Sequence, residues 1–521
     1  MDIPEPPPDL DRAESSPGLV GNVPSMGDLM SFPLGTPSRS DIMGIPDPYM
    51  DPNAGMLTSI ASYESIRSLG FGFSQREPVR DARQVLKMND RGDYCVPSAR
   101  LYPYSWNWDA SFTAMGWASW KPARAWAELE TLFRGQWMDG MLPSIVFHRH
   151  DPGYFPGPDV WRAPPANMQY SADMPRTTGI TQPPIVASCV RQLVEKQNLH
   201  ETALVHAHKM LPKLVSYHEW FFKSRMDDEG IGRVAIHHPW ESGMDNSPSW
   251  DEPLEHVVVS PELPAYERKD TQHVDSDMRP TQKQYDRFLT LVLSFRDAGY
   301  EPKACSSSTQ FRVADVCVNA ILLRANKDLL WLCTKILSAK EVLDLDSRRI
   351  GEIQELQVRV REWINLGNAA LDSMWSDEIG TYCAYDEIRG KHVNVSTSAA
   401  FLALYGGHAS RERATRLTEL LSSWLEHVKY GVPSVDPSDE KLFDAKRYWR
   451  GPVWLVVNWM ISEGLERYEY YELAERVRRA SRELIKESGH YEYFDPSTGA
   501  GCGGPDFSWT AAIALAWFPD L

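Results

Sequence analysis

The spacing of apolar residues predicts helices along most of the chain. Between Thr202 and Lys223, apolar side chains recur at steps of three and four residues, which places them on one face of a helix. The same periodicity recurs in five further segments: Arg312–Leu337, Ile353–Met374, Ala409–His427, Val453–Leu465 and Tyr468–Ile485. Strand-like alternation is confined to short stretches such as Arg233–His237. The regular spacing of the helices predicts an all-α fold, arranged as a toroid.

The first 56 residues differ from the rest in composition. They contain 11 of the 38 prolines and no Trp, Cys or Lys. A segment of this kind buries too little apolar surface to offset the entropy of ordering it. We therefore predict a Pro-rich, partly disordered extension over residues 1–56 and one helical catalytic domain over residues 57–521. The long loops of that domain are rich in Pro, Gly and aromatic residues, and long loops in compact domains are usually functional.

The charge balance excludes some classes of partner. With 54 Lys and Arg against 71 Asp and Glu, the net charge is −17, which disfavours binding to nucleic acid or to an anionic membrane surface. The chain contains no apolar run of the roughly 20 residues that span a bilayer. Its start, MDIPEPPPDLDRAE, lacks the features of a secretory signal. Seven scattered cysteines without a CxxC pair favour a reducing, cytoplasmic location. The oligomeric state stays open, a homo-oligomer included.

The first segment with candidate chemistry is LYPYSWNWDAS, residues 101–111. It combines several aromatic rings with one carboxylate, Asp109. Aromatic faces can stack on a sugar ring, and a carboxylate can accept hydrogen bonds from two neighbouring hydroxyls. The alternative is an aromatic core cluster in which Asp109 caps the next helix, since Asp is a favoured N-cap residue.

A second segment, HHPWESGMDNSPSWD, spans residues 237–251. Its carboxyls lie close in sequence to Trp240 and Trp250, and Gly243 permits a tight turn. Partial desolvation beside indole rings raises the pKa of a carboxyl, as a general acid at neutral pH requires. The alternative is an acidic surface turn, which would gain little from two Trp residues.

Two further segments carry aromatic residues near the C-terminus. In KRYWRGPVWLVVN, Pro452 fits the first turn of a helix that begins at Val453, so ordinary helix-start packing is the alternative to a ligand-binding role. In GHYEYFDPSTGAGCGGPDFSWT, Glu492 lies between two Tyr residues and precedes a Gly-rich loop that allows close approach of a ligand. A phosphate loop is disfavoured because no Lys follows the glycines.

Asp245 and Glu492 thus form a candidate catalytic pair in aromatic loops. Paired carboxyls beside an aromatic pocket are the usual equipment for glycosidic bond cleavage, in which one protonates the leaving oxygen. The other either activates water, with inversion, or attacks directly, with retention. The sequence does not give their separation, so both outcomes stay open at this point.

The segments WESGMDNSPSWD, YWRGPVW and HYEYFDPSTG…FSWTAA resemble the mannosylglycerate and glucosylglycerate hydrolases of glycoside hydrolase family 63. LKMNDRGDYCVPSARLYPYSWNWD is similar to their N-terminal signature, and the resemblance covers about residues 80–520. ESGMD is also similar to the ESGWD of family 37 trehalases. The resemblance implies an (α/α)6 barrel whose long loops form the active-site pocket. It also implies an inverting mechanism with no required metal or cofactor, acting on a small anionic glycoside.

Carried over residue by residue, the resemblance assigns Asp245 as general acid and Glu492 as general base. It assigns positions that hold the sugar to Trp106, Trp108, Asp109, Gln182, Trp240, Gly243 and Trp454. It assigns positions around the glycerate to Tyr102, Tyr154, Arg287, Tyr448 and Trp449. The alternative for Arg287 is a surface ion pair with a neighbouring acid such as Asp286.

The expected activity is hydrolysis of 2-O-α-mannosylglycerate, 2-O-α-glucosylglycerate or both to hexose and D-glycerate. The alternatives are a trehalase-like or α-glucosidase activity on neutral disaccharides, and a non-catalytic sugar-binding protein. Glu241 and Asp251 are rival acids, with Glu241 expected to orient its loop or bind sugar hydroxyls. His237 and His238 are expected to be structural, because adjacent His side chains point in different directions and a third ligand at suitable spacing is lacking.

Overall fold

The computed structural model describes residues 78–518, apart from residues 100, 150, 152, 165–174 and 273. These residues belong to one compact unit that extends from Ser74 to Leu521. The expected extension over residues 1–56 and its boundary lie outside the described residues. None of the helices in the described part is both long and apolar enough to cross a membrane.

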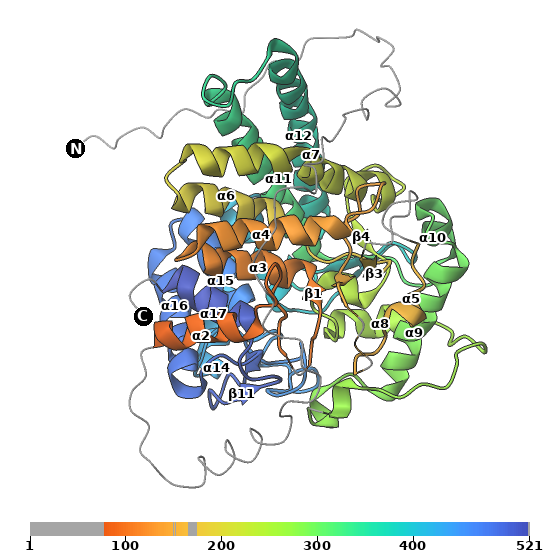
Figure 1. Ribbon diagram of the computed structural model, residues 1–521. Helices are drawn as coiled ribbons and strands as arrows, with labels where there is room; N and C mark the ends of the chain where they lie inside the picture. Colours follow the sequence, from red (N-terminus) through yellow and green to blue (C-terminus); the bar gives the residue numbers. More distant parts are fainter. Residues whose placement is uncertain are drawn as a thin grey trace, which may run out of the picture. The chain divides into compact units, whose positions relative to one another are not determined.

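The described part is mostly helical (Figure 1). Its longer helices are α2 (Pro78–Asn89), α3 (Asn107–Ala118), α4 (Pro122–Leu132), α6 (Val186–Lys196), α7 (Glu201–Ser224), α9 (Gln282–Asp297), α11 (Val316–Ser338), α12 (Ser347–Ser373), α14 (Arg411–His427), α15 (Leu455–Arg467), α16 (Tyr471–Ser488) and α17 (Ser508–Trp517). The shorter helices are α5 (Pro158–Trp161), α8 (Asp251–Glu255), α10 (Pro302–Ser308) and α13 (Leu402–Gly406).

The helices predicted from apolar periodicity are confirmed. Most of their ends lie within a few residues of the predicted positions. α7 illustrates the cause, because its predicted apolar face is buried: Leu204, Ala207, Leu211, Leu214 and Val215. Polar caps fix where helices begin. The side chain of Asp315 accepts a hydrogen bond from the backbone of Val318 at the start of α11, which satisfies one of the free N–H groups of the first turn. α15 begins at Leu455 rather than at the expected Val453.

Neighbouring helices pack in a regular order. α3 contacts α17 and α6, α11 contacts α6 and α13, and α15 contacts α13 and α17. A second set lies against this first set, since α4 contacts α3, α7 contacts α6 and α11, α12 contacts α11, α16 contacts α15 and α2 contacts α17. α3 and α17 are buried on nearly all sides, as expected for helices in the centre of a large helical domain.

Small antiparallel sheets in the loops qualify the all-α prediction. Their strands are β1 (Ser105–Trp106), β2 (Ile145–Phe147), β3 (Arg176–Thr177), β4 (Ala235–Ile236), β5 (Val313–Ala314), β6 (Trp375–Ser376), β7 (Thr381–Tyr382), β8 (Ala384–Asp386), β9 (Lys391–Val393), β10 (Tyr493–Phe494) and β11 (Gly501–Cys502). The sheet orders are β1-β2-β3, β4-β5-β8-β9, β6-β7 and β10-β11. β4 lies within the expected strand 233–237.

Two of these sheets position candidate site residues. In the first, Trp106 pairs with Ile145, which places the indole at the start of α3. In the second, Tyr493 pairs with Cys502, and this hairpin holds the preceding residue, Glu492, beside the Gly-rich loop. The loops therefore carry the candidate chemistry on a rigid helical support.

Candidate active site

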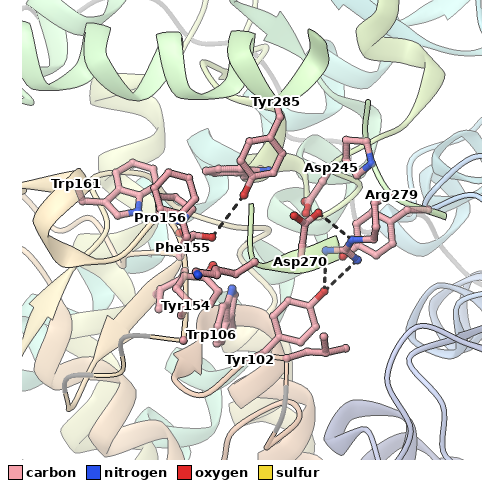
Figure 2. A pocket seen from close by; sticks show the side chains of 18 of the residues that line it. Tyr102, Trp106, Tyr154, Phe155, Pro156, Trp161, Asp245, Asp270, Arg279 and Tyr285 are labelled. Carbon is pink, nitrogen blue, oxygen red and sulfur yellow. Dashed lines mark hydrogen bonds and ion pairs between the residues drawn. The ribbon is translucent and has the colours of Figure 1, made fainter. Parts of the chain in front are cut away.

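One pocket gathers residues from several separated segments of the chain (Figure 2). It encloses about 910 Å³, including its opening to solvent. Seven residues expected at the site line it: Tyr102, Trp106, Tyr154, Gln182, Trp240, Asp245 and Tyr448. A concave site with aromatic walls and a few polar groups suits a small polar ligand such as a glycoside.

Asp245 lies in the turn that follows the short 3-10 helix η3 (Pro239–Ser242). The turn needs Gly243, whose φ is +70°, and a Cβ there would lie 2.8 Å from the ring of Trp108. Burial raises the pKa of Asp245 to about 7, a rise that the charge of Arg279 opposes and that of Glu492 supports. A carboxyl with this pKa is largely protonated at slightly acidic pH and can donate a proton.

Glu492 is a second buried carboxyl, 1% exposed, which lies behind Tyr102 of the pocket wall. Its Oε1 accepts a hydrogen bond of 2.9 Å from the hydroxyl of Tyr102, and its Oε2 accepts one of 3.3 Å from the backbone N–H of Gly504. Burial raises the pKa of Glu492, while the charge of Arg279 and these donors oppose the rise. Hydrogen bonds that favour the ionised form are what a general base requires.

Arg279 supplies positive charge at the pocket, with 8% of the residue exposed. Its Nε donates to Asp270 at 3.3 Å, and its Nη1 and Nη2 each donate to the hydroxyl of Tyr102 at 3.3 Å. The guanidinium lies over the ring of Tyr448, 4.3 Å from the ring centroid. This fixed, planar cation is suited to a carboxylate ligand.

Asp270 holds two arginines near the pocket. Its carboxylate forms a bidentate pair with Arg268 at 3.0 and 2.6 Å and also accepts from Arg279. Although burial alone would raise the pKa of Asp270, the hydrogen bonds and charges of the two arginines lower it. Arg268 in turn lies over the ring of Tyr285 at 4.5 Å. Asp270 is therefore an anion in this site, and its charge orients the guanidinium groups.

Aromatic rings form the wall of the pocket around these polar groups. Trp106 makes edge-to-face contacts with Tyr102 at 5.3 Å and with Tyr154 at 5.4 Å between ring centroids. Trp240 contacts Tyr285 at 6.0 Å, also edge to face. Such arrangements restrict the orientation of each ring.

A second layer of expected site residues lies behind this wall. Trp449 and Trp454 stack in parallel at 3.7 Å and are each 1% exposed. Trp449 has a φ of +58°, a left-handed conformation that costs energy in a non-glycine residue. Trp108 is 2% exposed and contacts Trp449. Within the described residues, these three Trp side chains do not line the pocket. They pack behind its wall instead.

Asp109 belongs to the same layer. It lies in the first turn of α3, whose N-cap residue is Trp106, so Asp109 does not cap this helix. Burial raises its pKa well above the ordinary value, and the charges of Glu492 and Asp245 raise it further. This rise favours the protonated form of Asp109, which can donate as well as accept a hydrogen bond.

Arg287 lies away from the pocket, contrary to the expected place beside the glycerate. It is on α9 two residues after Tyr285, which lines the pocket. Two residues correspond to about 200° around a helix, so the two side chains point in different directions. Its Nη2 instead donates to the backbone carbonyl of Glu255 at 3.5 Å. The alternative, an ion pair with Asp286, is not formed either, since that carboxylate accepts from Tyr266 and Gln282.

Several pocket residues were not identified from the sequence, among them Lys269, Asp270, Arg279 and Tyr285. Arg279 and Asp270 lie in the irregular segment that precedes α9, where no periodicity indicates which side chains point inward. One signal was present, since Thr281 and Gln284 form a capping box that starts α9. That motif places Arg279 at the end of a loop rather than on a helix.

The rival acids have structural partners. The carboxylate of Glu241 pairs with Arg225 at 3.1 Å and accepts from the backbone of His237 at 2.7 Å, so it orients the loop as expected. Asp251 pairs with Arg450. His238 accepts from the backbone of Trp240 and bonds the carbonyl of Phe288. Over the described residues, no group of three or more His, Cys, Asp or Glu side chains could hold a metal ion.

Comparisons with known proteins find relatives over most of the chain. A family model described as the mannosylglycerate hydrolase MGH1-like glycoside hydrolase domain matches residues 102–510. Mannosylglycerate hydrolase MGH1 from Selaginella moellendorffii is 46% identical over 448 residues, which cover 86% of each chain. Glucosylglycerate hydrolase from Mycolicibacterium hassiacum is 32% identical over 459 residues, which cover 85% of this chain and 98% of that protein.

A solved structure is also similar. The crystal structure of the GH63 mannosylglycerate hydrolase from Thermus thermophilus in complex with Tris and D-glycerate has a TM-score of 0.77 and 43% identity to this chain. The match covers 85% of this chain and 100% of that one. The chain therefore belongs to the mannosylglycerate hydrolase-like family of glycoside hydrolases.

Proposed function

We propose that this glycoside hydrolase cleaves 2-O-α-mannosylglycerate, and more slowly 2-O-α-glucosylglycerate, to hexose and D-glycerate. The observation that carries the proposal is a pocket with Asp245 on its wall, whose lining residue Tyr102 donates to the buried carboxylate of Glu492 and accepts from Arg279. The order of preference rests on the relatives, because the mannosylglycerate hydrolase is 46% identical and the glucosylglycerate hydrolase is 32% identical.

In the proposed reaction, Asp245 and Glu492 act as acid and base. Asp245 gives its proton to the glycosidic oxygen as the bond from that oxygen to the anomeric carbon breaks. A water molecule attacks the same carbon from the opposite face, and Glu492 takes the proton that the water loses. Both carboxyls then return to their starting states by exchange with solvent. The product hexose has the inverted anomeric configuration.

The same pocket explains a preference for an anionic leaving group. Arg279 can hold the glycerate carboxylate by charge-assisted hydrogen bonds, and Lys269 adds a second cation at the pocket. This interaction is remote from the anomeric carbon, so its binding energy serves to orient the substrate. A neutral disaccharide would bring no carboxylate to Arg279 beyond that of Asp270, which disfavours a trehalase-like activity.

We also propose that the helices close into an (α/α)6 barrel. The inner set would be α3, α6, α11, α13, α15 and α17, and each member contacts the next in this order, with α17 returning to α3. The outer set would be α4, α7, α12, α14, α16 and α2. The expected cytoplasmic location also stays a prediction, which fractionation of cells that express a tagged chain would test.

Two variants test the assignment of the carboxyls. We expect Asp245→Asn and Glu492→Gln each to lower kcat by at least about 10³-fold, by analogy with removal of an essential acid or base. Both should retain substrate binding in calorimetry. Asp251→Asn is the matched control, since Asp251 begins α8 shortly after Asp245 and pairs with Arg450 outside the pocket lining, and its kcat should fall by less than about tenfold. Wild-type turnover in either catalytic variant would contradict the assignment.

A further inference from the structure

The hydroxyl of Tyr102 lies between Arg279 and Glu492. It donates to Oε1 of Glu492 at 2.9 Å and accepts from both Nη atoms of Arg279 at 3.3 Å, as Figure 2 shows for the arginine. A phenol has one proton and two lone pairs, so it can make these contacts together. The three groups form a continuous path from the pocket cation to the proposed base.

The guanidinium at one end of this path is held on several sides. Asp270 accepts from its Nε, and the ring of Tyr448 lies beneath it. Its charge therefore stays near Glu492 whether or not a ligand is bound. Because the site is buried, the charge acts at a lower dielectric constant than it would in water.

Other titratable or polar groups also face Glu492. Asp109 on α3 and Asp245 after η3 are carboxyls that interact with it electrostatically. Glu492 is also surrounded by Tyr448, the backbone N–H of Gly504, and two residues of the β10–β11 hairpin, Tyr493 and Cys502. Of the described groups that interact with Glu492, Arg279 is the one that carries a positive charge.

We propose that Tyr102 is a positioning residue that couples the binding of an anionic leaving group at Arg279 to the protonation of Glu492. The inference rests on the proposed function. In addition to that function, the glycerate carboxylate that binds Arg279 changes the protonation of the two catalytic carboxyls.

The direction of the coupling follows from charge. In the free enzyme, Arg279 lowers the pKa of both Glu492 and Asp245 against the effect of burial. A bound glycerate carboxylate neutralises this cation, so the pKa of both carboxyls rises. A higher pKa makes Glu492 a stronger base, and it keeps Asp245 protonated to higher pH. A neutral leaving group produces neither effect.

The wild-type enzyme provides the first test. The pH dependence of kcat/KM reports the free enzyme, and that of kcat reports the complex with substrate. For mannosylglycerate, we expect both limbs of the kcat profile to lie about 1 pH unit above those of kcat/KM, as for loss of one nearby charge. For the neutral amide, mannosylglyceramide, the two profiles should coincide.

The second test removes the hydrogen bonds that the hydroxyl of Tyr102 makes to Glu492 and Arg279. Tyr102→Phe should raise the acid limb of kcat/KM, which reports Glu492, by about 1 pH unit and leave the alkaline limb, which reports Asp245, in place. Tyr104→Phe is the matched control. The hydroxyl of Tyr104 forms hydrogen bonds with the backbone of Asp151 rather than with Glu492 or Arg279. Both limbs of the profile should therefore keep their wild-type positions.

The outcomes separate this inference from the proposed function. If the wild type hydrolyses mannosylglycerate but its kcat and kcat/KM profiles coincide, the coupling is wrong and the proposed function stands. If Tyr102→Phe and Tyr104→Phe move the acid limb equally, Tyr102 has no special role and the inference fails. If the wild type releases no hexose from mannosylglycerate, both the function and the inference are overturned.

Discussion

Replacement of Arg279 by Gln tests the glycerate anchor. The Nε and one N–H of each Nη face Asp270 and Tyr102, which uses three of the five N–H groups of a guanidinium. The remaining two point in different directions, so one of them can donate to a substrate carboxylate. A hydrogen bond between charged groups contributes about 1.5–3 kcal/mol. Because Arg279 is largely buried, we expect a loss near the upper value, about 3 kcal/mol or roughly 10²-fold in kcat/KM.

The assay compares mannosylglycerate with mannosylglyceramide. Arg279→Gln also disturbs Tyr102 and Glu492, which lowers activity on both substrates. The anchor is therefore measured by the ratio of the two kcat/KM values, which should fall by roughly 10²-fold. Arg287→Gln is the control, because this arginine lies on α9 with its Nη2 against the carbonyl of Glu255, and its ratio should stay at the wild-type value. Equal loss on both substrates in Arg279→Gln, or a selective loss in Arg287→Gln, would refute the reasoning.

Two further predictions concern the support of the site. Gly243→Ala should destabilise the protein by about 2–4 kcal/mol, because it combines a left-handed backbone with a Cβ 2.8 Å from Trp108; unchanged thermal stability and turnover would contradict this. Asp315→Asn should stabilise the protein above pH 7. Burial raises the pKa of Asp315 to about 7. Between about pH 4 and 7, the unfolded state therefore releases a proton that the native state keeps. As the pH rises through this range, the free energy of unfolding of the wild type falls by up to about 4 kcal/mol. Asn can cap the helix without this pH-dependent loss, because its side chain does not ionise. If the stability of the wild type and of Asp315→Asn changed equally from pH 5 to pH 8, this prediction would be wrong.

The helices were predictable because their cause is local. A face of apolar residues such as that of α7 must be buried, and its 3.6-residue period is visible in the sequence. The carboxyls of the site were also predictable, since Asp245 and Glu492 are surrounded in sequence by aromatic residues. The small sheets were largely missed, because strands of two or three residues are too short for alternation to be recognised.

The identity of the pocket cation was not predictable in the same way. Arg287 has the helical context and the charge, but which side of α9 faces the pocket depends on the packing of Tyr285 and Phe288. Arg279 reaches the pocket through an irregular loop, and its place depends on Asp270 and Tyr102, which lies 177 residues away in sequence. Likewise, Trp449 and Trp454 stack on each other behind the wall, an arrangement that their sequence spacing does not reveal.

The most direct test of the proposed activity is to follow the reaction by proton NMR. Purified protein would be incubated with 2-O-α-mannosylglycerate and the anomeric signals recorded from the first minutes. The account predicts equal amounts of D-glycerate and mannose, with the β-anomer of mannose appearing first and the α-anomer growing later by mutarotation. Release of the α-anomer first would contradict the inverting mechanism, and absence of free mannose would contradict the proposed function itself.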